Sequence, residues 1–324
     1  MMTKKIFTPF YLFFLVTTLF VGCKEIPAKS VQEEVMTDDV KPFFKLSLAQ
    51  WSLHRAIGNN ELDPLDFAEK AKAMGFEGIE YVSGLYTKKL ESMGMEALQQ
   101  ALKEKSEAHG VENVLIMVDG EGDLAASDEK ERNQAIENHK KWVDAAQFLD
   151  CHSIRVNLFG SNNADEWIAN STIGLKKLAE YGKSKGINII VENHGGFSSN
   201  AGLLVQVMKN IDMANCGTLP DFGNFCVKRE GGGKWDGKCI DDYDKYKGVE
   251  EMMPYAKGVS AKSYDFDAAG NETTLDYPRF LKSVKDSGYT GFVGVEFEGN
   301  NVSEEKGIAL TRGLLLKIGK DLSN

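Results

Sequence analysis

The sequence has too little basic charge for a typical nucleic-acid-binding protein. Its 38 lysines and arginines stand against 48 aspartates and glutamates, which leaves a formal net charge of −10 over 324 residues. An acidic surface repels a phosphate backbone, so nucleic acid is not an expected partner. The five cysteines match no zinc-ribbon or CxxC spacing. No G-x-G-x-x-G follows the first predicted strand, which disfavours an open dinucleotide-binding sheet.

The sequence also lacks an apolar run that would comfortably span a membrane, which takes about 20 residues. The most apolar stretch, residues 10–21, follows Lys4 and Lys5 and ends at Gly22 and Cys23. A short apolar run behind basic residues is the pattern of a secretory signal.

The segment LFVGC at residues 19–23 resembles a bacterial lipobox, which implies that Cys23 carries a lipid. The alternative is an ordinary cleaved signal with an incidental cysteine. We predict a lipoprotein signal peptide over residues 1–22 and a flexible tether over the polar residues 23–42. The protein would then be exported and held to a bacterial membrane by its lipid alone, on the periplasmic face or the cell surface.

From residue 43 onward, short apolar runs alternate with helical patterns. The runs predict eight strands, at residues 44–48, 78–82, 114–118, 153–157, 187–192, 216–221, 259–262 and 292–297. Several helical segments stop at a glycine, as at Gly75, Gly186 and Gly288. Repeated βα units with right-handed crossovers close a parallel sheet on itself. We therefore predict an α/β fold, a single-domain (β/α)8 TIM barrel over residues 43–324, with an open doubly wound sheet as the alternative.

One connection, residues 225–247, is unusually long for a compact domain. It contains the glycines 231–233 and Trp235. Long loops are often functional, so we interpret it as a lid or specificity loop over the barrel mouth, or else as a surface excursion. Cys226 and Cys239 flank its glycines, and they form either a disulfide in an oxidising compartment or two separate thiols.

Three late strands each end in a carboxylate that strand alternation directs into the barrel: Glu192, Asp221 and Glu296. In the fifth strand, for example, Ile189 and Val191 lie on the opposite face from Glu192. Barrel enzymes hold their chemistry at these strand ends. Three buried carboxylates require a cation, and hard divalent metals prefer oxygen ligands. The alternative is three separate, solvated strand-end acids.

The sequence resembles the xylose isomerase-like barrel superfamily, in particular its sugar phosphate isomerase/epimerase group, which also includes AP endonuclease family 2. The resemblance covers about residues 43–320 and is carried by the segments GFEGIE, NIIVENHGG, GTLPDFGNF, GVSAKSYDFD and GFVGVEFEG, in this order. It implies one divalent metal (Mn, Mg, Co or Zn) held by Glu192, Asp221, a seventh-strand histidine and Glu296. It also implies that the two glutamates move protons on opposite faces of a ketose.

The seventh strand departs from the group's usual His-x-Lys, because Ser260-Ala261-Lys262 stands in its place. Three explanations are open. His194 or another nearby group completes the metal shell, the metal is bound weakly through carboxylates and water, or Lys262 replaces the cation. A lysine among carboxylates would also polarise a sugar carbonyl.

Further polar and aromatic residues at strand ends make a plausible sugar pocket, since aromatic faces stack on sugar rings and polar side chains bind hydroxyls. The expected substrate-binding residues are Trp51, His54, Glu80, Arg155, Asn157, His194, Asn224 and Glu298. Three other histidines, at 109, 139 and 152, are expected to be structural and away from the mouth.

We therefore predict an enzyme, an isomerase or epimerase of a non-phosphorylated sugar or keto-sugar, with Glu192, Glu296 and Lys262 as catalytic residues. Export argues against a sugar phosphate as the substrate, because sugar phosphates are cytoplasmic metabolites. The first alternative is a keto-sugar lyase or dehydratase of the inosose dehydratase type. The second is a lipid-anchored carbohydrate-binding barrel whose metal site has decayed. The sequence does not indicate an oligomeric state.

Overall fold

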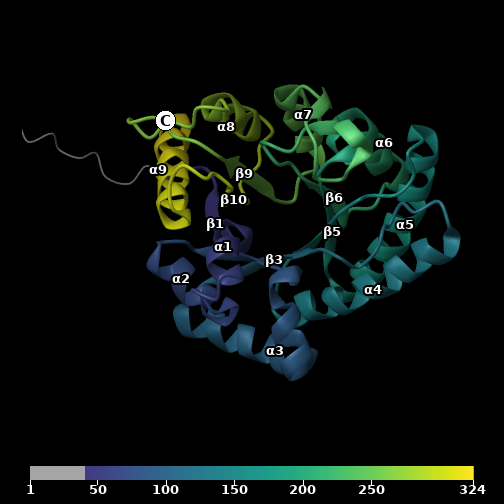
Figure 1. The fold of residues 1–324 in the computed structure, drawn as a ribbon, viewed down its shortest axis with the longest axis horizontal. Coiled ribbons are helices and arrows are strands. Elements are labelled where there is room, and N and C mark those ends of the chain that lie inside the picture. Colours follow the sequence, from purple (N-terminus) through teal and green to yellow (C-terminus); the bar gives the residue numbers. More distant parts are fainter. Residues whose placement is uncertain (1–40, 324) are drawn as a thin grey trace, which may run out of the picture. The chain divides into compact units, whose positions relative to one another are not determined.

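Eight parallel strands form the centre of the domain, in the order β6-β5-β4-β3-β2-β1-β10-β9 (Figure 1). Bridges from Thr218 to Ala256 and from Asp221 to Ser260 join the two outer strands, so the sheet closes into a barrel. The strands are β1 (Lys45–Ala49), β2 (Gly78–Val82), β3 (Glu112–Val118), β4 (Ser153–Val156), β5 (Asn188–Glu192), β6 (Cys216–Leu219), β9 (Val259–Ser263) and β10 (Phe292–Phe297).

The structure, a computed structural model, describes residues 41–323. The predicted signal peptide, Cys23 and all but the last two residues of the predicted tether lie outside this range. Within it, each of the eight predicted apolar runs overlaps one strand, and the predicted TIM barrel is confirmed. The predicted ends shift by a few residues; β6, for instance, ends two residues before Asp221.

Strand alternation separates two apolar layers. Ile189 and Val191 of β5 belong to the large core between the sheet and the helices. Ile190 belongs to a smaller cluster with Leu115 and Leu219, which fills the inside of the barrel. Burying a side chain of this size contributes about 1.5–3 kcal/mol to folding, so both layers hold the register of the strands. Glu192 shares the inward parity of Ile190.

Helices surround the barrel (Figure 1). They are α1 (His54–Gly58), α2 (Phe67–Ala73), α3 (Thr87–His109), α4 (Glu129–Phe148), α5 (Ala164–Lys185), α6 (Ala201–Ile211), α7 (Lys245–Met252), α8 (Tyr277–Asp286) and α9 (Glu304–Ser323). The predicted glycine stops are confirmed, as at Gly186, which caps α5 with a left-handed φ of 75°. None of the helices in residues 41–323 is both long and apolar enough to cross a membrane.

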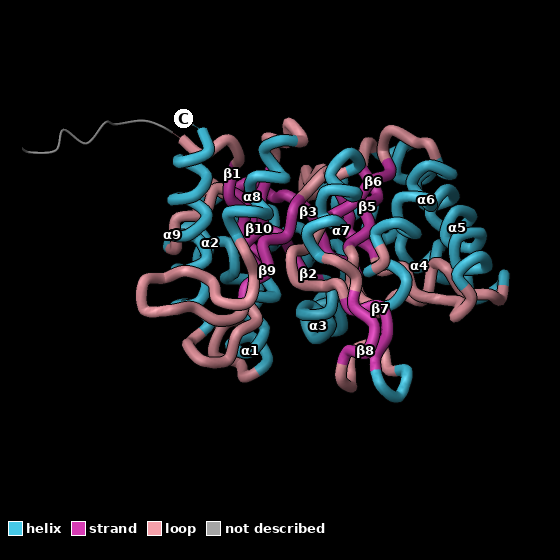
Figure 2. Tube along the Cα trace, turned by 90° about the horizontal axis from the view of Figure 1, so that it is seen from above, coloured by secondary structure: helices cyan, strands magenta, loops and turns pink. Residues whose placement is uncertain are grey.

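The long connection after β6 contains a two-stranded antiparallel hairpin, β7 (Cys226–Arg229) and β8 (Cys239–Asp242). A disulfide joins Cys226 to Cys239, so the structure selects the first of the two predicted alternatives. Figure 2 shows the hairpin projecting from the barrel on the same side as α1. Because α1 follows β1, this is the side on which the parallel strands end.

Candidate active site and metal centre

The three predicted carboxylates lie together inside the barrel. Glu192 is the last residue of β5, Glu296 lies near the end of β10, and Asp221 follows β6. One oxygen atom of each lies within 4.8 Å of the others, and all three side chains are buried. Parallel strands bring their carboxyl ends to one edge, which is why residues more than 100 positions apart meet here.

Ser260 and Lys262 of β9 occupy the side of the cluster where the seventh-strand histidine was expected. Ser260 Oγ lies 2.6 Å from Oδ2 of Asp221 and 2.9 Å from Oε2 of Glu296. Lys262 Nζ donates to Oε1 of Glu296 at 2.8 Å and to Oε1 of Glu298 at 2.9 Å. The acids therefore contact two hydrogen-bond donors, the neutral hydroxyl of Ser260 and the cationic amine of Lys262.

The donor set fits a divalent cation. Asp221 Oδ1 is occupied by the backbone N–H groups of Gly223 and Asn224, which leaves Oδ2 toward the other acids. Glu192 Oε2 is buried without a hydrogen bond, although Arg155 Nε lies 2.9 Å away out of line. An orphaned buried carboxylate oxygen beside two other acidic oxygens is a suitable ligand set for a hard metal ion.

Burial raises the pKa values of two carboxyl groups of the cluster. It raises the pKa of Glu192 to about 7, although the Arg155 guanidinium opposes the shift. It raises the pKa of Asp221 to about 8, although Lys262 opposes it. Further positive charge, as a metal ion would supply it, favours the charged form of both groups.

Arg155 of β4 is the second buried cation of the site. Its Nη1 donates to Oδ1 of Asp119 at 2.9 Å, and Asn157 donates to the same oxygen at 2.7 Å. Burial raises the pKa of Asp119, but Arg155 outweighs it and the net pKa is lowered. Arg155 is thus held between Asp119 and Glu192, with its planar head fixed.

His194 lies beside this network and outside the carboxylate cluster. Its Nδ1 is 2.7 Å from Oδ1 of Asn157, and its ring centroid is 4.3 Å from that of Trp235. Burial and the nearby Arg155 lower its pKa to about 3, so the ring is neutral near pH 7. Ser260 and Lys262, and not His194, fill the gap left by the expected histidine.

Glu80 is buried deeper than a substrate-binding residue would be. Ser47 donates to its Oε1 at 2.5 Å, while Oε2 has no hydrogen-bond partner. Burial raises its pKa to about 8. A Cβ on Gly294 would come within 2.5 Å of Glu80 Oε1, so only glycine leaves room for this carboxyl group.

A cavity of about 1170 Å³ opens at the strand ends. Among its lining residues are seven of the predicted substrate-binding residues and one predicted catalytic residue: Trp51, His54, Arg155, Asn157, His194, Asn224, Glu298 and Glu296. The other predicted residues, Glu80, Glu192, Asp221 and Lys262, are buried and do not line it. Asn224 donates to Glu192 and Lys262 donates to Glu296, so the buried groups contact the lining directly.

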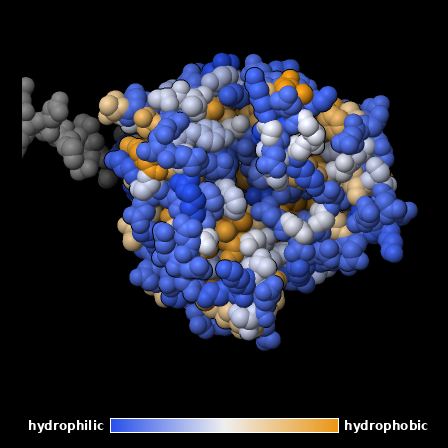
Figure 3. Space-filling model, in the orientation of Figure 1, coloured by the Kyte–Doolittle hydropathy of each residue, from blue (hydrophilic) through white to orange (hydrophobic). Residues whose placement is uncertain are grey.

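Figure 3 shows a mostly hydrophilic face with a hollow near its middle and hydrophobic residues within and beside the hollow. His139 of α4 also lines the cavity, which corrects the expectation that it lies away from the mouth. His109 and His152 are not among the lining residues.

Sequence reasoning missed several residues of the site. Asp119 directly follows β3, and the strand-end rule that selected Asp221 would also have selected it. Phe159 and Lys234 line the cavity from loops whose sequences have no helical or strand periodicity that would predict this position. The position of Trp235 was noticed in the sequence, but its contact with His194 depends on the path of the hairpin.

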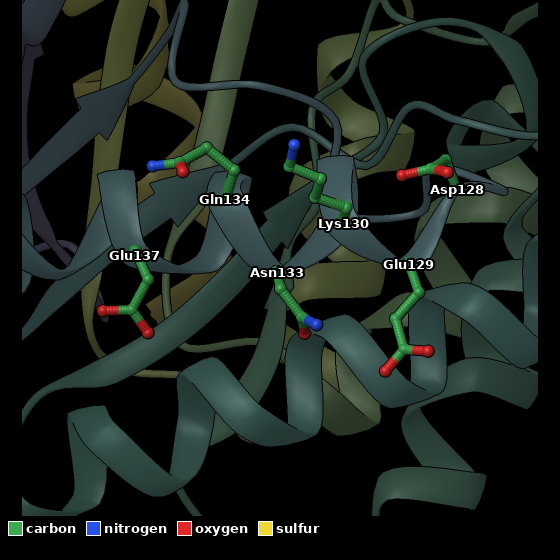
Figure 4. Close-up of a pocket in the computed structure, with 6 residues that line it drawn as sticks. All are labelled: Asp128, Glu129, Lys130, Asn133, Gln134 and Glu137. Atoms are coloured by element: carbon green, nitrogen blue, oxygen red, sulfur yellow. The ribbon is translucent and has the colours of Figure 1, made fainter.

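A second depression lies along the start of α4 (Figure 4). Its lining residues, Asp128, Glu129, Lys130, Asn133, Gln134 and Glu137, are polar and all at least partly exposed. In Figure 4 these side chains do not converge on a common point. We interpret this depression as a solvated helix face.

Comparison with known proteins identifies one family. The profile of the family described as "Xylose isomerase-like TIM barrel" matches residues 68–317. This range includes all three clustered carboxylates and most of the barrel.

Solved structures share the fold at low sequence identity. D-allulose 3-epimerase from Methylomonas sp. has a TM-score of 0.64 at 13% identity, with 86% of this chain and 98% of that chain covered. For 3-keto-D-glucoside 4-epimerase from E. coli the TM-score is 0.61 at 13% identity, with 78% of this chain and 94% of that chain covered. For the IOLI protein with a bound zinc atom the TM-score is 0.63 at 13% identity, with 86% of this chain and 99% of that chain covered.

One curated protein matches over a short stretch. The C-glycoside deglycosidase alpha subunit of Arthrobacter globiformis is 40% identical over 50 residues, which is 15% of this chain and 14% of that protein. The match therefore spans about one seventh of the length of that relative.

Proposed function

Because the chain belongs to the xylose isomerase-like TIM barrel family, we propose that it is a sugar isomerase or epimerase acting on a non-phosphorylated sugar or keto-sugar. The observation that carries this proposal is the buried cluster of Glu192, Asp221 and Glu296 directly beneath a large cavity. Structural neighbours named as epimerases of sugars support the same reaction class.

The reaction needs one group to remove a proton beside a carbonyl and one to return it. In the metal-free protein burial raises the pKa of Glu192 to about 7, and a bound cation would hold the side chain as the carboxylate, which is the form that removes a proton. Glu296 lines the cavity and is held by Ser260 and Lys262. Removal by one glutamate and return by the other on the opposite face inverts the carbon, which is epimerisation.

The remaining residues set the charge and the substrate's position. A divalent ion bound by Glu192, Asp221 and Glu296 would polarise the substrate carbonyl. Lys262 acts through Glu296 and Glu298, because its own amine is fully buried behind them. Asn157, Asn224 and the Arg155 head line the cavity and can bind sugar hydroxyls.

Elimination from a keto-sugar is the second candidate reaction. It begins with the same proton removal, but a leaving group departs instead of a proton returning. The short match to a C-glycoside deglycosidase subunit favours it.

Export is part of the proposal. The disulfide between Cys226 and Cys239 supports it, because disulfides persist in oxidising compartments and are rare in the cytosol. The lipobox-like segment ending at Cys23 would place the barrel on a tether at a membrane.

Exchange of hydrogen for deuterium tests the proposal. The protein is incubated in D₂O with a panel of ketoses and 3-keto-glycosides, and products are followed by mass spectrometry and NMR. One deuterium gained with an inverted centre supports epimerisation, whereas loss of water or of an aglycone supports elimination. Glu192→Gln and Glu296→Gln should abolish either reaction. Absence of turnover by the wild-type protein on every ketose and 3-keto-glycoside of the panel, with sugar affinity unchanged in both variants, would instead identify a carbohydrate-binding protein.

A further inference from the structure

The β7–β8 hairpin places a half-exposed tryptophan over the barrel mouth. Trp235 lies in the segment between the two strands, and 49% of it remains exposed. It nevertheless makes ring contacts with two other strand-end loops, to Phe159 at 5.3 Å and to His194 at 4.3 Å between centroids. A large aromatic side chain that is positioned yet half uncovered has a free face for a ligand.

Several contacts fix this segment above the cavity. Lys234 Nζ lies 2.9 Å from Oδ1 of Asp123 across the mouth and 4.5 Å above the Phe159 ring. The disulfide between Cys226 and Cys239 ties the two strands together. Gly195 has a φ of 90°, and its missing Cβ would be 3.6 Å from Trp235, so the β5 loop passes close beneath the indole.

The cavity is larger than one sugar ring needs. Its volume of about 1170 Å³ exceeds the roughly 300–1,000 Å³ of most small-molecule sites. A second aromatic surface lines it away from the hairpin, where Trp51 stacks on His54 at 4.5 Å. We assign the reacting ring to the polar groups around Glu296, which leaves the Trp235 side of the cavity for a second ring.

We propose that Trp235, Phe159 and His194 form an aromatic subsite for a second ring, so that the substrate is a glycoside with a ring-bearing aglycone or a disaccharide, and not a free monosaccharide. The inference rests on the proposed function for the identity of the reacting ring. The subsite itself needs only the geometry of the hairpin and the cavity. Stacking of one ring adds roughly 0.5–1.5 kcal/mol, which corresponds to about a tenfold gain in affinity at its upper end.

Calorimetric binding to matched glycosides tests the subsite without turnover. Glucose, galactose and mannose are each tested in three forms. These are the methyl glycoside, the phenyl glycoside and the disaccharide in which the sugar is linked to glucose. For at least one sugar, the wild-type protein should bind a two-ring probe about tenfold more tightly than the methyl glycoside. Trp235→Ala should remove that preference and leave methyl-glycoside affinity unchanged. A preference for the phenyl glycoside alone would identify an aromatic aglycone, and a preference for the disaccharide a second sugar.

Ile240→Ala is the matched control, because Ile240 is 55% exposed on the same hairpin and does not line the cavity. It should keep the two-ring preference. Equal affinities for one-ring and two-ring probes in the wild type, or a preference that survives Trp235→Ala, would overturn the subsite. If the subsite is overturned in this way but deuterium exchanges into a free ketose, the proposed reaction is still supported. A Trp235-dependent preference without deuterium exchange into any ketose or 3-keto-glycoside would sustain the subsite and overturn the reaction.

Discussion

Lys262 Nζ lies 2.8 Å from Oε1 of Glu296, and the two residues are register partners on the neighbouring strands β9 and β10. The same amine is 2.9 Å from Glu298 and 3.9 Å from Asp221. Burial alone would lower the pKa of Lys262, but Glu296 and Asp221 outweigh it and hold the pKa well above its usual value. The amine is therefore a permanent positive charge in the carboxylate cluster.

Lys262→Met should destabilise the metal-free protein, because it leaves Glu296 buried without its cationic partner. Breaking a buried ion pair costs about 3–5 kcal/mol, which denaturant unfolding in a chelator will measure. The same change should tighten divalent-metal binding in calorimetry, since a competing cation is gone. Lys285→Met, at an exposed position in the last turn of α8, is the control and should change neither quantity. Unchanged metal affinity in Lys262→Met would show that amine and metal do not compete.

Protein purified without chelators should contain one divalent ion per chain. Glu192→Ala and Asp221→Ala should lose it by elemental analysis, whereas the exposed Glu96→Ala should retain it. At a metal concentration of 100 times the dissociation constant, binding should stabilise the fold by about 2.7 kcal/mol. Metal-free protein with full activity would contradict the proposed metal and leave Lys262 as the cation.

The stabilisation of the fold by a bound metal should increase with pH. Burial raises the pKa of Glu192 to about 7 and of Asp221 to about 8, so a metal must displace protons from both below those values. The same shifts mean that the metal-free fold loses stability as pH rises toward 8. We therefore expect the increase in melting temperature on adding metal to be larger at pH 8.5 than at pH 6. An equal increase at both pH values would contradict the raised pKa values of Glu192 and Asp221.

The eight apolar runs alternating with helical patterns were enough to predict the barrel, and alternation along single strands was enough to predict its inward carboxylates. Ile189 and Val191 pack outward and Glu192 points inward, as a period of two requires. The sequence also exposed the missing histidine at Ser260. Lys262 was one of three explanations offered for this gap, and the sequence could not choose between them, because the Lys262 contact depends on the register of β9 against β10.

Other parts of the site depend on long-range geometry in the same way. The pairing of Asp119 with Arg155 needs β3 and β4 in a particular register. The disulfide needed the hairpin to bring two cysteines 13 positions apart to a Cα–Cα distance of 5.8 Å. Spacing alone could not choose between a bridge and two thiols.

Glu80→Gln should make the fold less sensitive to alkaline pH. Burial raises the pKa of Glu80 to about 8 in the folded protein, above its ordinary value of 4.5. Its contribution to stability is therefore present below pH 4.5 and is lost as pH rises through 8. Glutamine keeps the acceptor for Ser47 and carries no charge. The advantage of the variant over the wild type in denaturant unfolding should grow between pH 5 and 9.

The exposed Glu77→Gln, just before the same strand, is the control for Glu80 and should follow the wild type at every pH. If the difference in unfolding free energy between Glu80→Gln and the wild type is the same at every pH, Glu80 ionises without a cost to stability. That result would exclude a neutral carboxyl group at Glu80, next to Gly294.

Replacing both Cys226 and Cys239 by serine should loosen the hairpin without unfolding the barrel. Closing a loop of about 15 residues with a disulfide is worth roughly 3 kcal/mol in the chain-entropy model. The bridge lies outside the eight-stranded sheet, so the loss should be local. Hydrogen exchange should accelerate over residues 226–242 and stay unchanged in α5. Reducing the wild-type protein should reproduce this pattern. If exchange over the hairpin does not change, the contacts of Lys234 and Trp235 with the barrel loops are sufficient to hold it, and the disulfide is not what positions Trp235.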